Sequence, residues 1–419
     1  MSRVHKVVVI GGGYAGTLAA NHLRMRSDMH ITLVNARPEF VDRIRLHQYA
    51  AGTGEAAIDY GTLLGEGVEL VVDSAARIDT AARVVRLESG RALDYDYVIY
   101  AVGSVGATPS AVPGAAEFAY DIAEYEPARR LRARLADLAL DARVTVVGGG
   151  LTGIETAAEL AEQGRRVTLV CGRSLAPTFS TGSRRYLAGW LARHGVEVIE
   201  GAEVREVRTD AVVLDRDPGA GARHGGADAG APGGDPGGGV LDGGRPRASA
   251  LTIWAAGFGV PQLAVASGLR TDGLGRLLTD ETLTSIDDER IVAAGDAAAP
   301  SGRALRMSCY AAGPLGAQAA NTVLSRIEGT EPATLTLGFS GACVSIGRRA
   351  GVRQFARKDD TAINVYISGR AGAAIKEATC RLAVARIRRE ARKPGSVVWV
   401  KGDPRPVRPV LNGEVAGSR

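Results

Sequence analysis

The chain has 419 residues, more than a single hydrophobic core usually supports, so we expect two or three domains. Its net charge of +5 is too small to indicate nucleic-acid binding. No apolar run reaches the roughly 18 residues that a membrane-spanning helix needs. The N-terminus passes directly into an apolar strand pattern and leaves no room for a signal peptide, so we expect a cytoplasmic protein.

Four cysteines are too widely spaced to form a zinc-binding motif or a local redox disulfide. They are Cys171, Cys309, Cys343 and Cys380. We therefore expect no metal site and a reducing compartment.

The chain begins with a strand, a glycine-rich turn and a helix. Residues 7–10 are all apolar and predict a buried strand, and residues 17–24 predict a helix. Between them Gly11, Gly13 and Gly16 have the G-x-G-x-x-G spacing. The first glycine permits a tight turn, the second lets the backbone approach a pyrophosphate, and the third lets the helix pack closely on the strand. The N–H groups at the helix N-terminus then face the phosphates, which predicts a dinucleotide site.

Two segments after this unit supply candidate contacts to the dinucleotide. A second apolar strand, residues 31–34, ends at Asn35, where such folds usually carry an acidic residue that binds the adenosine ribose. Asn35 keeps one acceptor, its carbonyl oxygen. The polar segment 40–48 follows at the carboxyl edge of the sheet and would place Arg43 near the phosphates. The alternative for this segment is a solvated basic turn.

A small antiparallel insertion precedes the return of the chain to the first sheet. A strand at 68–72 and hairpin strands at 76–79 and 83–88 make up this insertion. An apolar strand then closes the unit and ends in Gly103. Residues 121–140 have a helical pattern in which the arginines lie on a solvated face.

The opening pattern repeats at residues 143–161. Apolar strand residues again precede the G-x-G-x-x-G spacing, now at Gly148, Gly150 and Gly153, and a helix follows. Two such units are far more specific than one. With one cofactor each, they indicate a flavin and a nicotinamide nucleotide between which hydride passes.

The sequence of the second unit is compatible with either NADH or NADPH. A carboxylate after the strand at 167–170 would bind the 2′-hydroxyl of NADH, but Cys171 stands at that place. Arg173 is placed to receive the 2′-phosphate of NADPH, or is a surface arginine. Both NADH and NADPH therefore remain candidates.

The next segments interrupt the second unit and then complete the first. Residues 217–248 are dense in Gly, Pro, Ala and Asp and predict a disordered insertion. Order resumes in a strand that ends at Gly257. A short apolar strand then leads to Gly295 and Asp296, whose carboxylate can accept a hydrogen bond from a ribityl hydroxyl of FAD. The helix at 311–327 would begin beside the flavin.

The remaining residues, 332–419, predict a separate piece with a small β layer and a basic helix. Strand patterns at 342–346 and 363–367 precede the helix at 373–393. The apolar stripe of this helix consists of Ile375, Leu382 and Ile387. The stripe is thin for a membrane-surface helix, so docking on the protein's own core is favoured and contact with anionic lipid is the alternative.

Taken in order, these motifs resemble the two-dinucleotide-binding-domain flavoprotein superfamily, and within it the type II NADH:quinone oxidoreductase-like group. The resembling segments are VVVIGGGYAG, YDYVIYAVGS, VTVVGGGLTGIETAAELAE, TIWAAGF and IVAAGDAA. The resemblance implies an α/β fold with two Rossmann-like domains and a small C-terminal α+β region. The FAD-binding domain would be discontinuous, 1–115 and 280–330, with the NAD(P)H-binding domain, 116–279, inserted in it and the C-terminal region at 331–419.

The resemblance also implies the residues of the site. FAD would be held by Gly11, Gly13, Tyr14, Ala15, Gly16, Asn35, Ala36, Arg43, Ala76, Ala101, Gly103, Gly295 and Asp296. NAD(P)H would be held by Gly148, Gly150, Gly153, Arg173 and Gly257. Glu155 matches a family glutamate close to the nicotinamide and the flavin. Cys309 and Tyr310 are further candidate catalytic residues, in a segment where the family's usual glutamine pattern is replaced.

We therefore predict a FAD-dependent NAD(P)H dehydrogenase that passes hydride from NAD(P)H to FAD and electrons to a quinone-like acceptor. A cytoplasmic location is expected, with a peripheral position on the cytoplasmic membrane as the alternative. Two other enzymes remain open: a sulfide:quinone or disulfide-type reductase using Cys309 and Cys343, and a soluble flavin oxidoreductase acting on a small organic substrate. A redox-sensing binding protein is least favoured. The sequence does not name the acceptor or the oligomeric state.

Overall fold

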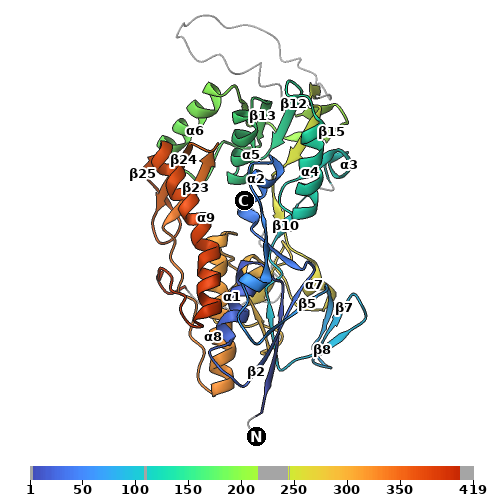
Figure 1. Ribbon diagram of the computed structural model, residues 1–419, viewed down its shortest axis with the longest axis vertical. Coiled ribbons are helices and arrows are strands. Elements are labelled where there is room, and N and C mark those ends of the chain that lie inside the picture. Colours follow the sequence, from blue (N-terminus) through green and yellow to red (C-terminus); the bar gives the residue numbers. More distant parts are fainter. Residues whose placement is uncertain (1–2, 108–110, 216–243, 245, 406–419) are drawn as a thin grey trace, which may run out of the picture.

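Two central parallel sheets lie at opposite ends of an elongated molecule, and a long C-terminal helix runs along one side of both (Figure 1). The computed structural model describes residues 3–107, 111–215, 244 and 246–405. The first glycine-rich turn belongs to the lower sheet in this view and the second to the upper sheet. The predicted α/β class with two Rossmann-like units is confirmed.

The first sheet has five parallel strands in the order β21-β9-β1-β2-β5. They are β21 (Ile291–Ala293), β9 (Tyr97–Tyr100), β1 (His5–Ile10), β2 (Met29–Asn35) and β5 (Val68–Val72). Both faces of the sheet are covered, and this explains why β1 is apolar without alternation: Val7 and Val9 enter one core, and Val8 and Ile10 enter the other. β21 joins from a point in the chain beyond the second sheet.

Two helices cover one face of this sheet. α1 (Tyr14–Leu23) packs along α8 (Cys309–Glu328), and both are rich in buried alanine. A Cβ added at Gly316 would lie 2.2 Å from the carbonyl oxygen of Ala15. Glycine is therefore required where these two backbones meet, and this contact fixes the start of α8 beside the first glycine-rich turn.

The other face of the first sheet packs on the antiparallel layer predicted from the hairpin pattern. Its strands are β6 (Ala75–Asp79), β7 (Val84–Leu87) and β8 (Ala92–Asp94). The short helix α7 (Leu263–Ala266) contacts β6. A further pair of strands, β20 (Leu277–Thr279) and β22 (Ala298–Pro300), flanks β21 in the sequence.

The polar segment 40–48 is a folded connection between the two halves. β3 (Glu39–Val41) pairs with β4 (Ala57–Asp59), a 3₁₀ turn (Arg43–Arg45) follows β3, and α2 (Leu46–Ala50) packs on the second unit. All five residues of α2 are buried. A solvated basic turn was therefore the wrong alternative, because Asp42, His47 and Gln48 are buried and the two arginines are half-buried.

The second sheet repeats the plan of the first, in the order β11-β18-β12-β13-β14. The strands are β11 (Ala119–Asp121), β18 (Leu251–Trp254), β12 (Arg143–Val147), β13 (Arg166–Cys171) and β14 (Glu197–Glu200). Helices α3 (Ala115–Phe118), α4 (Tyr125–Asp137), α5 (Leu151–Glu162) and α6 (Thr181–Arg193) accompany it. β10 (Val105–Gly106) and β19 (Phe258–Gly259) pair where the chain passes between the units.

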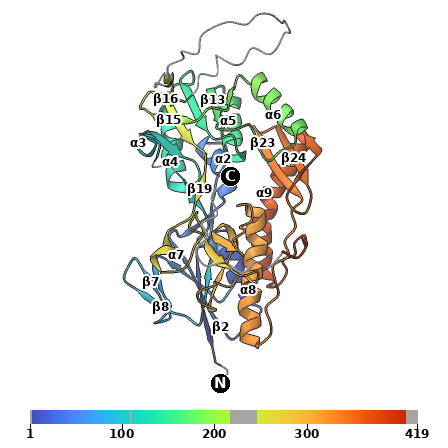
Figure 2. The same ribbon diagram turned by 180° about the vertical axis from the view of Figure 1, so that it is seen from behind.

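A second antiparallel layer lies against the second sheet (Figure 2). It consists of β15 (Val204–Val207), β16 (Ala211–Leu214) and β17 (Pro246–Ala248). The disordered insertion was predicted to extend to Ala248, but Pro246–Ala248 pair with β16 and belong to the layer. The rest of that prediction, 217–243 and 245, lies outside the described residues.

The C-terminal region adds a three-stranded sheet and the long helix. The sheet consists of β23 (Gly341–Ile346), β24 (Ala350–Ala356) and β25 (Ala362–Ser368), and α9 (Gly369–Arg392) packs on β24 and α1. The helix docks on the protein's own core, as favoured from the sequence. Its buried stripe differs from the predicted one, however: Cys380, Val384 and Ile387 are buried, whereas Leu382 is exposed.

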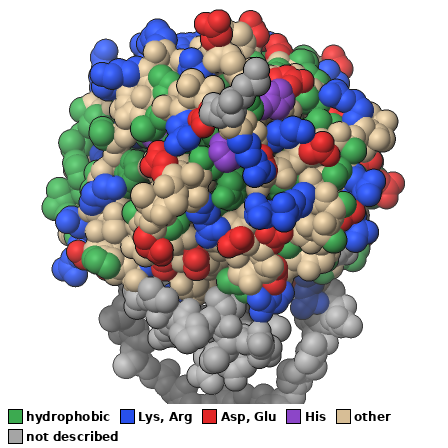
Figure 3. Space-filling view, turned by 90° about the horizontal axis from the view of Figure 1, so that it is seen from below, with side chains coloured by type: hydrophobic (Ala, Val, Ile, Leu, Met, Phe, Trp, Pro, Cys, Tyr) green, Lys and Arg blue, Asp and Glu red, His purple; other side chains and the backbone are tan. Residues whose placement is uncertain are grey.

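At the end of the molecule that carries the N-terminus, no one type of side chain dominates the surface. Basic, acidic and apolar side chains are interspersed on this face (Figure 3). Among the described residues, no helix is both long and apolar enough to cross a bilayer.

Candidate functional site

A cavity of about 380 Å³ lies at the carboxyl ends of β1, β2 and β9. Most of the residues predicted to hold FAD line it: Gly11, Gly13, Tyr14, Ala15, Asn35, Ala36, Arg43, Ala101, Gly103, Gly295 and Asp296. Two do not. Gly16 lies behind the turn, and Asp73, Ser74 and Ala75 line the cavity where Ala76 was predicted.

The three glycines of the first turn have different roles. Gly11 has a φ of +101°, which favours glycine. A Cβ at Gly16 would lie 1.8 Å from the carbonyl oxygen of Gly11, so this position needs glycine for helix packing. At Gly13, by contrast, an added Cβ would meet no protein atom within 4 Å. Because Gly13 lines the cavity, the space beside it is available to a ligand.

Asn35 supports the glycine-rich turn. Its Oδ1 accepts a hydrogen bond from the backbone N–H of Gly12 at 2.9 Å, and its Nδ2 donates to the carbonyl oxygen of Arg37 at 2.8 Å. To bind the ribose as predicted, Asn35 would therefore use the remaining lone pair of Oδ1.

Asp296 is held at the other side of the cavity by two serines. Its Oδ2 accepts from the Ser104 hydroxyl at 2.7 Å, and its Oδ1 accepts from the Ser308 backbone N–H at 3.1 Å. Arg43 also reaches this point, donating to the Ser104 carbonyl oxygen at 2.6 Å and to the carbonyl oxygen of Ala123 at 3.0 Å. Arg43 thus lines the cavity and joins the two units, rather than projecting freely toward a phosphate.

Several cavity residues had no recognisable sequence motif. The Tyr60 hydroxyl donates to the carbonyl oxygen of Gly12 at 2.6 Å, and Arg37 forms an ion pair with Glu126 of α4. These residues lie outside any glycine pattern, and Glu126 comes from the second unit. Arg37 lies two residues after β2, whereas Tyr60 follows β4, so the sequence gives no common motif for them.

The second glycine-rich turn has the same geometry as the first. Gly148 has a φ of +130°, a Cβ at Gly153 would lie 1.9 Å from the Gly148 carbonyl oxygen, and a Cβ at Gly150 would meet no protein atom within 4 Å. Gly257 follows β18 with a φ of +79°. Arg173 is exposed and has no side-chain partner among the described residues, whereas Cys171 is buried at the end of β13.

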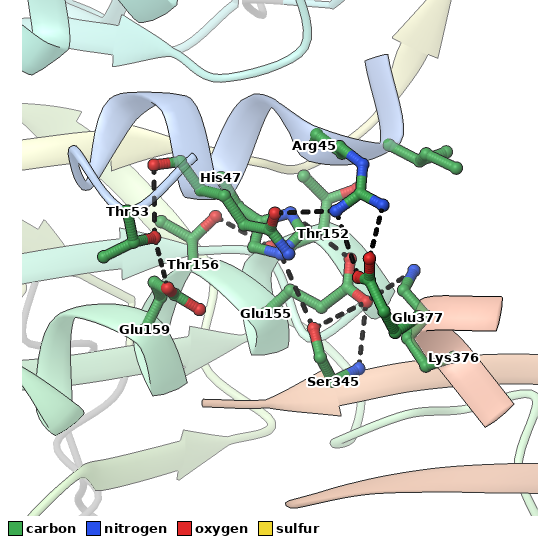
Figure 4. Close-up of polar contacts among 12 residues, drawn as sticks. Arg45, His47, Thr53, Thr152, Glu155, Thr156, Glu159, Ser345, Lys376 and Glu377 are labelled. Carbon is green, nitrogen blue, oxygen red and sulfur yellow. Dashed lines mark hydrogen bonds and ion pairs between the residues drawn. The ribbon is translucent and has the colours of Figure 1, made fainter. Parts of the chain in front are cut away.

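Glu155 lies in a buried polar cluster where the two units meet the C-terminal region (Figure 4). Lys376 of α9 places its Nζ 2.8 Å from Glu155 Oε1, and the Ser345 backbone N–H donates to the same oxygen at 3.0 Å. His47 Nδ1 is 3.6 Å from Glu155 Oε2. The four residues come from α2, α5, β23 and α9, so their meeting depends on the whole fold.

The model of the pyridine nucleotide-disulphide oxidoreductase family matches residues 5–320 of the chain. The chain belongs to this family. As a member it is an oxidoreductase that binds FAD and NAD(P)H, and the predicted resemblance to the type II NADH dehydrogenase group is confirmed.

The sequence similarity between this oxidoreductase and its relatives extends over most of the chain. The NADH dehydrogenase-like protein Rv1812c of Mycobacterium tuberculosis is 34% identical over 343 residues, which are 76% of this chain and 80% of the relative. The type II NADH:quinone oxidoreductase Ndh of the same organism is 26% identical, over 72% of this chain and 68% of the relative. The fold matches the sulfide:quinone oxidoreductase of Aquifex aeolicus with a TM-score of 0.75 at 17% identity, covering 93% of each chain.

The residues of the oxidoreductase fit the two cofactors. The open space at Gly13, the N–H groups at the start of α1 and the fixed carboxylate of Asp296 suit the pyrophosphate and ribityl groups of FAD. Gly150 and the start of α5 repeat the first two of these features for NAD(P)H.

The charges in the Glu155 cluster follow from burial and from the neighbours. Burial opposes ionisation of Glu155, but the charge of Lys376 and the hydrogen bonds from Lys376 and Ser345 outweigh burial and lower the pKa of the carboxyl group. Glu155 in turn outweighs the burial of Lys376 and raises the pKa of its ammonium group. Burial lowers the pKa of His47 to about 4, so its imidazole is neutral near pH 7. The oxidoreductase therefore holds an ion pair and a neutral imidazole at this point.

Asp42 interacts with a residue of the first cavity and with the charge of this cluster. Tyr14 lines the cavity and its hydroxyl donates to Asp42, which forms an ion pair with Arg45 at 3.3 Å. Burial raises the pKa of Asp42, and Lys376 counteracts part of that rise through its charge. The charge of Lys376 therefore acts on Asp42, the hydrogen-bond partner of Tyr14 at the cavity.

The other two candidate catalytic residues are placed less favourably for chemistry. Burial raises the pKa of the Cys309 thiol to about 12, which disfavours the reactive thiolate. The Tyr310 hydroxyl donates to the Gly338 carbonyl oxygen at 3.0 Å, and its ring packs on Phe339. Cys343 contacts Thr379 and Arg353, and Cys309 and Cys343 are both free thiols.

Proposed function

We propose that the protein is a FAD-dependent NAD(P)H dehydrogenase that reduces a quinone-like acceptor. Bound FAD would supply the redox chemistry that links hydride transfer from NAD(P)H to reduction of the acceptor. The net reaction converts NAD(P)H, one proton and a quinone into NAD(P)⁺ and a quinol. A quinone needs protons as well as electrons, so its reductase must supply proton-handling groups close to the flavin.

The buried Glu155–Lys376 pair is the observation that carries this proposal. Lys376 provides a fixed ammonium that stabilises negative charge on an acceptor that gains electrons before protons. Glu155 keeps that ammonium protonated, and the backbone N–H and hydroxyl of Ser345 orient the carboxylate. The relative named a type II NADH:quinone oxidoreductase supports the same acceptor class.

Two acceptors distinguish proton handling from electron transfer. Glu155→Gln should lower NADH-dependent reduction of a water-soluble quinone by about 100-fold. It should leave reduction of ferricyanide, which takes one electron and no proton, nearly unchanged. Steady-state turnover with each acceptor at equal flavin content measures both effects.

A matched control lies one turn along the same helix. Glu159 is also buried, but burial raises its pKa and its carboxyl group contacts Thr53 instead of Lys376. Glu159→Gln should therefore keep quinone turnover. An equal loss with both acceptors in Glu155→Gln would contradict the proposed role, because it would place the defect in hydride transfer or cofactor binding.

A disulfide-type reductase is the second candidate, supported by the match to a sulfide-quinone reductase of Aquifex aeolicus. It needs reactive cysteines, and the buried Cys309 thiol does not favour that chemistry. We expect a Cys309→Ser, Cys343→Ser double variant to keep quinone turnover within about twofold of the wild type. Loss of turnover with normal FAD content would favour the disulfide-type enzyme.

A further inference from the structure

A second cavity of about 270 Å³ lies between the second parallel sheet and the β15-β16-β17 layer. Its walls come from β12, β13, β16 and β17, of which β13 and β16 are labelled in the upper half of Figure 2. It shares no lining residue with the FAD cavity. It also lies toward the start of β12, at Arg143 and Thr145, whereas Gly148 follows the other end of this strand.

The interior of this cavity is apolar on two sides. Val170 projects from the parallel sheet, and Val212 and Leu214 project from the antiparallel layer. All three side chains are buried. Such walls suit a short hydrocarbon chain or an aromatic ring, and the volume lies just below the range of pockets that hold drug-sized ligands.

The Thr145 hydroxyl is the polar group in the cavity wall that is open to a ligand. Thr145 is only 4% exposed, and its hydroxyl makes no hydrogen bond with the described residues. Because Thr145 lines the cavity, its hydroxyl is available to hydrogen-bond a ligand or a water molecule there. The neighbouring Thr168 hydroxyl is satisfied, because it lies 3.1 Å from Glu197.

Among the described residues at the mouth, one positive charge has no ion-pair partner, that of the exposed Arg143. Arg247 is paired with Glu197. Arg143, at the start of β12, lines the cavity without an ion pair or a side-chain hydrogen bond among the described residues. The net charge of these three groups is therefore +1, which suits a ligand with a single negative charge.

We propose that this cavity binds a small monocarboxylate with an apolar body. The carboxylate pairs with Arg143 and accepts a hydrogen bond from the Thr145 hydroxyl. The body fills the space between Val170, Val212 and Leu214. Because the cavity is separate from both glycine-rich turns, the ligand binds without displacing FAD or NAD(P)H.

Calorimetric titration of the FAD-loaded protein with octanoate tests the proposal, with 1-octanol as the uncharged comparison. We expect one octanoate per chain, with 1-octanol at least about tenfold weaker. Arg143→Gln should weaken octanoate binding by about tenfold and leave 1-octanol unchanged. Thr145→Val, which preserves the shape of the side chain, should weaken octanoate by a smaller factor. Prior addition of NADH should not change the affinity.

Two further variants make the result decisive. Val212→Trp should fill the cavity and abolish binding of both probes, with folding checked by flavin content and circular dichroism. Arg129→Gln removes an exposed arginine of α4 outside the cavity and should leave both affinities unchanged. The proposal is overturned if octanoate does not bind, or if it binds equally well to the wild type, Arg143→Gln and Thr145→Val.

Discussion

Replacement of Gly13 by alanine should leave the protein folded but remove FAD. The added Cβ would meet no protein atom within 4 Å, and it would project into the cavity that Gly13 lines. We expect FAD binding to weaken by roughly 100-fold or more, equivalent to about 2.7 kcal/mol. The measurement is the ratio of bound flavin to protein after reconstitution with a known excess of FAD, with circular dichroism as the check on folding.

The second turn provides the matched control. Gly150→Ala has the same open surroundings, so it should also fold, but it should retain FAD and weaken NAD(P)H binding instead. Gly16→Ala differs from both, because its Cβ would clash with the Gly11 carbonyl oxygen and should impair folding itself. If Gly13→Ala retained full FAD affinity, or if Gly150→Ala lost its flavin, the assignment of the two cofactors to the two turns would be wrong.

Replacement of Lys376 by methionine should destabilise the protein strongly. It would leave the Glu155 carboxylate buried without its counter-charge, and breaking a buried ion pair in this way costs about 3–5 kcal/mol. Urea unfolding of the FAD-loaded protein measures the loss. The double variant Lys376→Met, Glu155→Gln contains no unpaired charge and should recover much of the stability. A double variant no more stable than the single variant would contradict the ion pair.

The same pair predicts the pH dependence of stability. The pKa of Glu155 is lowered on folding, so its contribution is present above its ordinary value of 4.5 and is lost as the pH falls through the folded-state pKa. The pKa of Lys376 is raised, so its contribution is present below 10.5 and is lost only as the pH rises through the folded-state pKa. In Lys376→Met burial instead raises the pKa of Glu155, and the variant should regain stability relative to wild type as the pH falls.

The two cofactor turns could be predicted because their requirements are local. Gly11 and Gly148 need a positive φ, and Gly16 and Gly153 need close contact between a helix and a strand only a few residues away. A short sequence therefore encodes the whole geometry. The return of β21 to the first sheet was predictable for a related reason, since an apolar strand followed by Gly295 and Asp296 repeats the strand-end chemistry of such sheets.

The Glu155 cluster could not be predicted in the same way. Glu155 was identified from its place after the second turn, but its partners come from α2, β23 and α9, which are far apart in the sequence. Lys376 lies in the helix predicted at 373–393, which the sequence characterises only as basic, and tertiary packing shows that this lysine is buried against Glu155. Leu382 was assigned to the apolar stripe because large apolar side chains are usually buried. In the structure Leu382 is exposed, and the smaller Cys380 and Val384 face the core.

Anaerobic titration of the purified protein with NADH and with NADPH tests the central claim most directly. We expect a yellow protein whose visible flavin absorption is bleached by stoichiometric nucleotide and returns when a quinone is added. The relative rates with the two nucleotides, measured also in Arg173→Ala, show whether this arginine binds a 2′-phosphate. A protein that cannot be loaded with FAD, or whose bound flavin neither nucleotide reduces, would contradict the account.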